Sequence, residues 1–375
     1  MRPAALLSFK IRQHSQRFAP KREVVAPRGF EMSVTSETHD VDFSKASFWD
    51  LAPSPSRVDE IDSMLRLRLA ESFEYLGGLP SFEAGRRTAL SGLMERLKAG
   101  PVSPWVFCLY SRLVAELSKG AQDQDNAESF DAVADAALLP AGQGVIRLRD
   151  STIPNSWWDH FQLLLDTDPL SPFRPVVPTA EQFLRCEHEI AAGLELMRRI
   201  DSTWHDEAKS LLRSIVLGSP PNPDPESVFN GASTFFLWGA ALLSANLSRP
   251  PISMVDILVH ESSHVLLFGL TFNGGLTRNS GEERYGSPVR PDERPIDGIF
   301  HACFVTTRVH LAMKRLLDSG SLHEDDRRLA IQHLQYNEEG GRKSLAVLAR
   351  HAEPTRVGEA ILGELQKYWT NQPGG

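Results

Sequence analysis

The sequence predicts a predominantly helical α+β protein. Apolar residues recur at helical spacing through most of the chain, for example at Ile61, Leu65 and Leu69. Two short stretches are instead typical of strands: residues 144–153, where apolar and basic residues alternate, and the β-favouring run 227–238. With 375 residues, of which 41% are hydrophobic, the chain can bury one large core or two smaller ones.

Three regions are expected along the chain. Residues 1–55 are predicted to be irregular or disordered, because they are first basic and then rich in Ser and Thr without a compact apolar segment. A disordered tail is favoured there over an organelle transit peptide. Residues 56–178 are expected to form a helical N-terminal region that ends in the Pro-rich passage 168–178, and residues 179–375 a metal-binding catalytic region.

The elements follow from the same periodicity and from Gly, Pro and capping signals at their ends. They are helices over 57–75, 81–98, 104–117 and 127–139, the strand within 144–153, one long helix or two joined near Asp201 over 179–217, the strand within 227–238, a helical turn over 239–247, and helices near 253–268, 295–317, 325–348 and 357–369.

Composition excludes several classes of protein. A net charge of -8 gives no electrostatic basis for nucleic-acid binding. No apolar run approaches the roughly 20 residues that span a bilayer. Cys108, Cys186 and Cys303 are too few and too scattered for a disulfide framework or a Cys-rich zinc site. Reduced thiols and a cytoplasmic location are therefore expected.

One helix carries the residues that predict chemistry. His260 and His264 are four residues apart, so on a helix both imidazoles leave the same face and can bind one metal ion. Ser253 and Asp256 have the spacing of a capping box at its start, and Gly269 is the expected stop. The helix is otherwise apolar almost all round, and buried imidazoles need partners, of which a metal is one.

A third metal ligand decides the class of enzyme. Leu267 and Leu270 occupy the positions where metzincins place Gly and His, which excludes that class. Glu282 and Glu283 have the spacing of a gluzincin ligand, but Gly and Pro bracket them as in a loop. The next strong helix carries His301 in its first turns, and His301 is therefore the predicted third ligand.

His310 lies nine residues beyond His301, about 180° around an ideal helix. It is expected to face away from the metal and to be solvated.

The residues after this motif resemble a known family. His260-Glu261-Ser262-Ser263-His264 is followed over residues 287–301 by the pattern Ser-Pro-x-Arg-x-Asp-x-Arg-Pro-x-x-Gly-x-x-His. Together they resemble the HExxH-containing peptide-modification proteins of ribosomal-peptide clusters, described as 2-oxoglutarate-dependent peptide β-hydroxylases. The resemblance covers about residues 227–317.

The resemblance implies a function and its cofactors. The metal would be Fe(II), held by His260, His264 and His301, with 2-oxoglutarate and dioxygen as co-substrates. Decarboxylation of 2-oxoglutarate would drive hydroxylation of a side-chain Cβ in a ribosomally made precursor peptide. Three histidines depart from the usual two-His-one-carboxylate triad, so Asp292 or Asp297 remains an alternative ligand.

The co-substrate's distal carboxylate calls for an arginine. Arg290, Arg294 and Arg308 are the candidates, although Arg290 and Arg294 also flank an aspartate with which they can pair, and Arg308 can equally be an ordinary arginine on a solvated face. Arg308 is two turns after His301 on the same helix face.

Two other functions remain open. In a zinc peptidase of the HExxH type, Glu261 would be the general base that acts on metal-bound water. In the hydroxylase it would contact the substrate or support a ligand. Both interpretations imply a zincin-like core with a small sheet. Its strand near 227–238 would be an edge strand that pairs with an extended peptide, or equally a plain strand of the core. The third hypothesis is a non-catalytic peptide-binding protein. Separately, the C-terminal helices are a candidate surface for a homo-oligomer.

Overall fold

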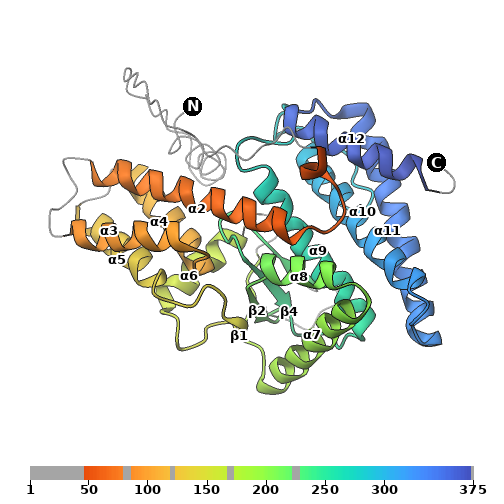
Figure 1. The fold of residues 1–375 in the computed structure, drawn as a ribbon, viewed down its shortest axis with the longest axis horizontal. Helices are drawn as coiled ribbons and strands as arrows, with labels where there is room; N and C mark the ends of the chain where they lie inside the picture. The colour runs from red at the N-terminus through yellow and green to blue at the C-terminus, as the bar shows by residue number, and fades with distance from the viewer. Residues whose placement is uncertain (1–45, 79–85, 119–122, 167–172, 222–228, 373–375) are drawn as a thin grey trace.

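The protein is predominantly helical around a small mixed sheet (Figure 1), which confirms the predicted fold class at that level. The computed structural model describes residues 46–78, 86–118, 123–166, 173–221 and 229–372. Most of the expected irregular segment 1–55 and part of the 227–238 strand prediction lie outside these residues.

Helices make up the N-terminal region. The predicted helices are confirmed where they are described, and the helix over residues 155–165, built around Trp157, Trp158 and Phe161, was not predicted. Ser54 caps the first long helix by accepting the Arg57 amide, and Pro55 occupies the first helical position. The elements are η1 (Ala46–Trp49), α2 (Pro55–Gly77), α3 (Arg87–Ala99), α4 (Pro104–Ser118), α5 (Asp123–Ala136) and α6 (Asn155–Leu165).

The sheet has the order β1-β2-β4-β3. β1, β2 and β4 are parallel, and β3 is antiparallel to β4 at one edge. β1 lies within the predicted strand 144–153. The four strands of the sheet are β1 (Gly144–Arg147), β2 (Ser214–Gly218), β3 (Gly231–Ala232) and β4 (Ala240–Ser244).

Two predictions of helix are wrong in this sheet. Residues 214–217 and 240–244 were expected to be helical, but they form β2 and β4, and every residue of both strands is buried. A short strand buried on both faces shows no alternation of polar and apolar residues, so its sequence cannot be told from a piece of buried helix.

Of the two alternatives for residues 179–217, the structure has two helices, α7 (Ala180–Ile200) and α8 (Ser202–Leu211), which meet at Asp201. Thr179 and Gln182 form a capping box at the start of α7. Asp201 then ends α7 and caps α8, because its carboxylate accepts the Thr203 amide at 3.0 Å.

The last four helices are α9 (Pro251–Leu270), α10 (Ile296–Asp318), α11 (Glu324–His351) and α12 (Arg356–Thr370). α9 lies at the centre of the molecule and packs against α2, α7, α8, α10, α11 and the sheet. Figure 1 shows the N-terminal helices on one side of it and α10–α12 on the other.

Glycines let neighbouring elements approach α9. A Cβ on Gly193 of α7 would lie 2.8 Å from Met254 Cγ, and a Cβ on Gly269 would lie 2.7 Å from Ile61 Cγ2. Gly269 is thus needed for close packing. The prediction that it stops the helix is wrong, since α9 continues to Leu270.

The predicted capping box at the start of α9 is also wrong. The N-cap is Pro250, which has no side-chain hydrogen bond to the helix, and Pro251 is the first helical residue. Ser253 and Asp256 lie inside the first turns, and their side chains contact α11 instead.

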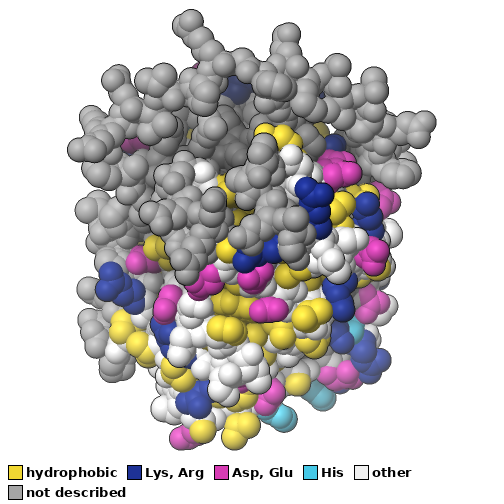
Figure 2. Space-filling model, turned by 90° about the vertical axis from the view of Figure 1, so that its left-hand side faces the viewer, with side chains coloured by type: hydrophobic (Ala, Val, Ile, Leu, Met, Phe, Trp, Pro, Cys, Tyr) yellow, Lys and Arg dark blue, Asp and Glu magenta, His cyan; other side chains and the backbone are white. Residues whose placement is uncertain are grey.

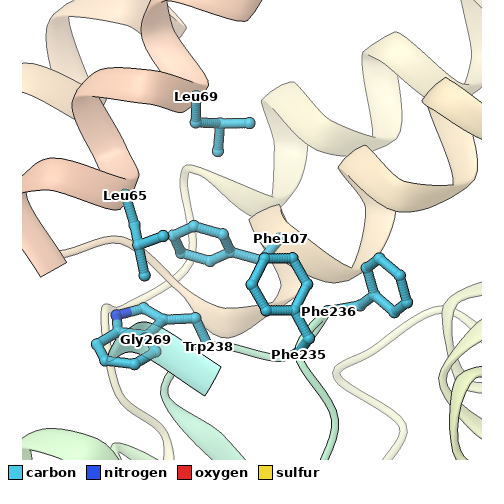
Figure 3. Close-up of a pocket in the computed structure, with 7 residues that line it drawn as sticks. All are labelled: Leu65, Leu69, Phe107, Phe235, Phe236, Trp238 and Gly269. Atoms are coloured by element: carbon cyan, nitrogen blue, oxygen red, sulfur yellow. The ribbon is translucent and has the colours of Figure 1, made fainter. Parts of the chain in front are cut away.

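Buried hydrophobic residues of both regions form one continuous cluster, from Phe48 to Leu365. The same interior holds a small apolar pocket between α2, α4 and the segment before β4 (Figure 3), where Leu65, Phe107 and Trp238 meet. The boundary expected near residue 178 therefore separates two regions that share a core, and their division into domains stays a prediction.

The interior also holds an ion network. Glu207 of α8 pairs with Arg57 of α2 at 3.1 Å and with Arg308 of α10. The Arg308 guanidinium lies over the Trp204 ring, 4.9 Å from its centroid. The network links α2, α8 and α10 across the core.

The surface shown in Figure 2 carries hydrophobic side chains near its middle with acidic and basic ones around them. Charges of both signs are interspersed on this face, in keeping with the modest net charge. Within the described ranges, no helix is long and apolar enough to cross a membrane.

Candidate metal centre

Two helices bring the three predicted ligands together. His260 and His264 lie one turn apart on α9, with ring centroids 5.0 Å apart. The first turns of α10 place His301 against His264, with ring centroids 5.5 Å apart and the ring planes inclined by 22°. Their Nδ1 atoms are 3.2 Å apart. Phe268, one turn further along α9, packs against His301 at 5.1 Å.

These spacings fit ligands of one ion. Two nitrogens that each lie about 2.1 Å from a metal, in tetrahedral or octahedral arrangement, are roughly 3.0–3.4 Å apart, and their ring centroids roughly 4.6–5.3 Å apart. The His264–His301 nitrogens and the His260–His264 rings meet these values, and the His264–His301 rings come within a few tenths of an ångström. In the described part of the chain, however, no three His, Cys, Asp or Glu side chains already form a complete metal-holding group. Two of the three pairs therefore have spacings that suit a shared ion, and the triad as a whole stays a prediction.

Burial sets the charge state of the cluster. It lowers the pKa of His260, and it lowers the pKa of His264 well below the usual value, with help from the neighbouring imidazoles and Arg290. Both rings are accordingly neutral at physiological pH. Neutral imidazole is the form that binds metals.

Glu261 lies beside the edge strand. Its side chain is buried against Gly231 of β3, where an added Cβ would lie 2.7 Å from the carboxyl carbon. Burial raises the pKa of Glu261 to about 7, although a hydrogen bond from Ser233 and the charge of Arg290 lower it. The Oε2 atom is buried without a hydrogen-bond partner in the described structure. A buried carboxyl in this state is suited to taking up and releasing a proton near neutral pH.

The three candidate arginines lie in different surroundings. Arg290 is exposed in the loop before α10, and its positive charge acts on His260, Glu261 and His264. Arg294 pairs with Asp292 at 2.6 Å, which is the alternative role expected for it from the sequence. Of the three arginines, Arg290 is thus the one whose charge lowers the pKa values of His260, Glu261 and His264.

Arg308 is engaged by another element. It is fully buried, pairs with Glu207 of α8 and stacks on Trp204. The alternative of a solvated arginine is therefore wrong. Binding of 2-oxoglutarate by Arg308 stays a prediction, and it would have to compete with Glu207 for the guanidinium.

Acidic residues in the loop before α10 and in the first turn of α10 are the alternative candidates for the third ligand. Glu282 and Glu283 are exposed and lie outside any helix, as predicted from their glycine and proline neighbours. Glu283 accepts the Tyr285 hydroxyl at 2.6 Å, and Asp297 accepts the Thr277 hydroxyl at 2.7 Å. These contacts do not favour a carboxylate as the third ligand.

The prediction that His310 is solvated is wrong. Its side chain is buried against α12. Its Nδ1 lies 2.6 Å from the Tyr368 hydroxyl, and its ring packs on Trp369. α12 covers this side of α10, which the periodicity of α10 alone could not indicate.

One polar cluster near the histidines was missed. His333 of α11 lies 2.7 Å from Asp256 and 3.0 Å from Ser253, and Asn337 donates to Asp256 at 3.2 Å. The sequence did contain a signal, because Ser253 and Asp256 lie on the same face of α9 as His260. In the sequence alone, however, the same spacing indicates a capping box.

Comparison with known proteins adds no further constraint. No protein-family model matches the chain, and no curated protein matches it. The interpretation of the metal centre therefore rests on the residues and geometry of this chain.

Proposed function

We propose that the protein is an Fe(II)- and 2-oxoglutarate-dependent oxygenase that hydroxylates the β-carbon of a residue in a ribosomally made peptide. The observation that carries the proposal is the contact between His264 and His301, whose nitrogens lie 3.2 Å apart. It joins the HExxH motif on α9 to the end of the longer pattern on α10, and His301 would supply the third ligand that the two histidines of the motif lack.

The chain's own residues have distinct roles in this proposal. His260, His264 and His301 would hold the ion. Arg290 supplies the cation for the distal carboxylate of 2-oxoglutarate, because its charge already reaches the cluster. Bound iron with 2-oxoglutarate and dioxygen would supply the oxidative chemistry.

The peptide is expected to bind along β3. This strand is last in the sheet order, so its outer backbone groups can pair with an extended segment. Gly231 sets β3 directly against Glu261. A peptide added to this edge would therefore lie beside the carboxyl and near the histidines of the same helix.

A zinc-dependent peptidase is the second candidate, and one observation favours it. Glu261 has a pKa of about 7 and lies between the histidine helix and the edge strand, which suits a general base acting on metal-bound water. The exposed Glu282 gives this candidate no ligand in the manner of gluzincins, so its third ligand would again be His301.

The experiment that separates the candidates starts from metal-free protein loaded anaerobically with Fe(II) and 2-oxoglutarate. Exposure to air in the presence of an extended test peptide should release succinate and add the mass of one oxygen to the peptide. His301→Ala should abolish both, whereas His188→Ala, an exposed helical histidine on α7, should leave them unchanged. Zinc-dependent cleavage of the peptide without added oxygen would instead establish the peptidase. Peptide binding that survives all three histidine substitutions, with neither reaction, would leave a non-catalytic binding protein.

A further inference from the structure

The cluster of Ser253, Asp256 and His333 has the geometry of a nucleophile, a base and an orienting carboxylate. Ser253 Oγ lies 3.0 Å from His333 Nε2. The other ring nitrogen, Nδ1, lies 2.7 Å from Asp256 Oδ2. Both distances are those of well-formed hydrogen bonds, and the imidazole links the hydroxyl to the carboxylate in the order that activates a serine.

The carboxylate fixes the tautomer of the ring. A carboxylate only accepts hydrogen bonds, so His333 Nδ1 carries the hydrogen and Nε2 is left bare to accept the Ser253 hydroxyl hydrogen. Asn337, which is buried, donates to the same oxygen of Asp256 at 3.2 Å and holds it in place. The ring is thus oriented from one side, and its basic nitrogen faces the serine.

Ser253 lies at the start of α9, where backbone amides are free of helix hydrogen bonds. Pro250, at the N-cap, gives them no side-chain acceptor either. The amides of Ile252 and Ser253 therefore have no acceptor within the helix, and the N-terminal end of a helix favours negative charge nearby.

The cluster is reachable from solvent. Its side chains are half-buried, with 16% of Asp256 and 24% of His333 exposed. Tyr336, one turn after His333 on α11, is exposed and presents an aromatic ring on the same side of that helix. An ester with an aryl group suits a site of this composition.

We infer that Ser253, His333 and Asp256 form a second reactive centre, distinct from the metal cluster, which transfers acyl groups from aryl esters to water. Ser253 Oγ attacks the ester carbonyl and gives its proton to His333 Nε2. The carbon–oxygen bond to the aryl group then breaks, and the leaving phenol takes that proton. Water attacks the acyl-serine, returns a proton through His333 and releases the carboxylic acid, which restores Ser253.

The test uses the full chain, treated with a chelator, and a fluorophosphonate probe that labels activated serines. Labelling is located by peptide mapping, and turnover is followed with 4-nitrophenyl acetate. One phosphonyl group on Ser253 is expected, with labelling that persists in the chelator. Ser253→Ala should abolish it, and His333→Gln or Asp256→Asn should slow it by about a hundredfold or more.

The chain offers a matched control. Ser111 also lies within 2.9 Å of a histidine nitrogen, that of His160, but it is buried and donates its hydrogen to the Cys108 carbonyl. Ser111 should stay unlabelled, and Ser111→Ala should label as the parent does. Circular dichroism and melting temperature verify folding of each variant, and mapping on the unaltered chain decides the matter even where a variant fails to fold.

Three results would overturn the inference: absence of label on Ser253 in the folded parent protein, equal labelling of His333→Gln, or labelling that is lost when metal is removed. Because the metal plays no part in this reaction, loss of the hydroxylase activity alone would not bear on it.

Discussion

Replacing Glu207 by Gln tests the buried ion network between α2, α8 and α10. Glu207 is 1% exposed, and its carboxylate is shared by Arg57 and by Arg308, which is 0% exposed. It also accepts the Ser54 amide at 2.7 Å. Glutamine keeps the shape but removes the charge, so two guanidinium groups would be left in the core without a counterion.

The expected loss of stability is large. Removing one partner of a buried ion pair costs about 3–5 kcal/mol, because the other charge stays buried and uncompensated. At about 2–4 °C per kcal/mol for a large domain, the melting temperature should fall by roughly 6–20 °C. Because Glu207 neutralises two buried arginines and not one, we expect a loss of stability in the upper part of that range.

The assay is thermal and urea unfolding followed by circular dichroism. Arg315→Gln serves as the matched control, since Arg315 pairs with Asp201 at the surface and is 62% exposed. That change should alter stability by less than about 1 kcal/mol. A similar small effect of Glu207→Gln would refute the reasoning that the network is closed to water.

A double variant distinguishes charge from packing. Glu207→Leu combined with Arg308→Met replaces the pair by apolar groups of similar size. It should be more stable than Glu207→Leu alone, because the single variant leaves both Arg57 and Arg308 without a counterion and the double variant leaves only Arg57. Additive destabilisation would contradict this. Where Arg308→Met folds, an unchanged KM for 2-oxoglutarate would exclude Arg308 as the co-substrate's anchor, and Arg290→Met should raise that KM.

Three further predictions follow from other sites. Gly231→Ala should destabilise the protein by about 1–3 kcal/mol through overpacking against Glu261, whereas Gly363→Ala, in open space on α12, should be neutral or stabilising in urea unfolding. Burial lowers the pKa of His310 to about 4 in the folded protein, so the neutral ring contributes stability that is fully present above about pH 6.5 and is lost as pH falls from there toward 4. His310→Gln should therefore remove about 2 kcal/mol of the fall in stability between pH 7 and pH 4.5, and an unchanged fall would contradict the assignment. His301→Ala should lose Fe(II) in equilibrium dialysis while His188→Ala retains it, and stoichiometric iron in His301→Ala would exclude His301 as a ligand.

The sequence alone determined most of the helices and the position of the HExxH motif on one of them. Helical periodicity and end signals are local, so they placed α9, α10 and the break at Asp201 within a few residues. The spacing of His260 and His264 fixes their common face in the same local way. His301 could be proposed as a third ligand because it lies in the first turns of the next apolar helix. Its contact with His264, however, depends on how α9 and α10 pack.

Tertiary structure decided what depends on residues distant in the chain. β2 and β4 are buried on both faces, so partners in space and not their own pattern make them strands. The counterion of Arg308 lies on α8, and the surroundings of His310 come from α12. Ser253 and Asp256 satisfy the local rule for a capping box, yet they bind His333, 77 residues beyond Asp256. Local rules say which face of a helix a side chain occupies, and only packing says what it meets there.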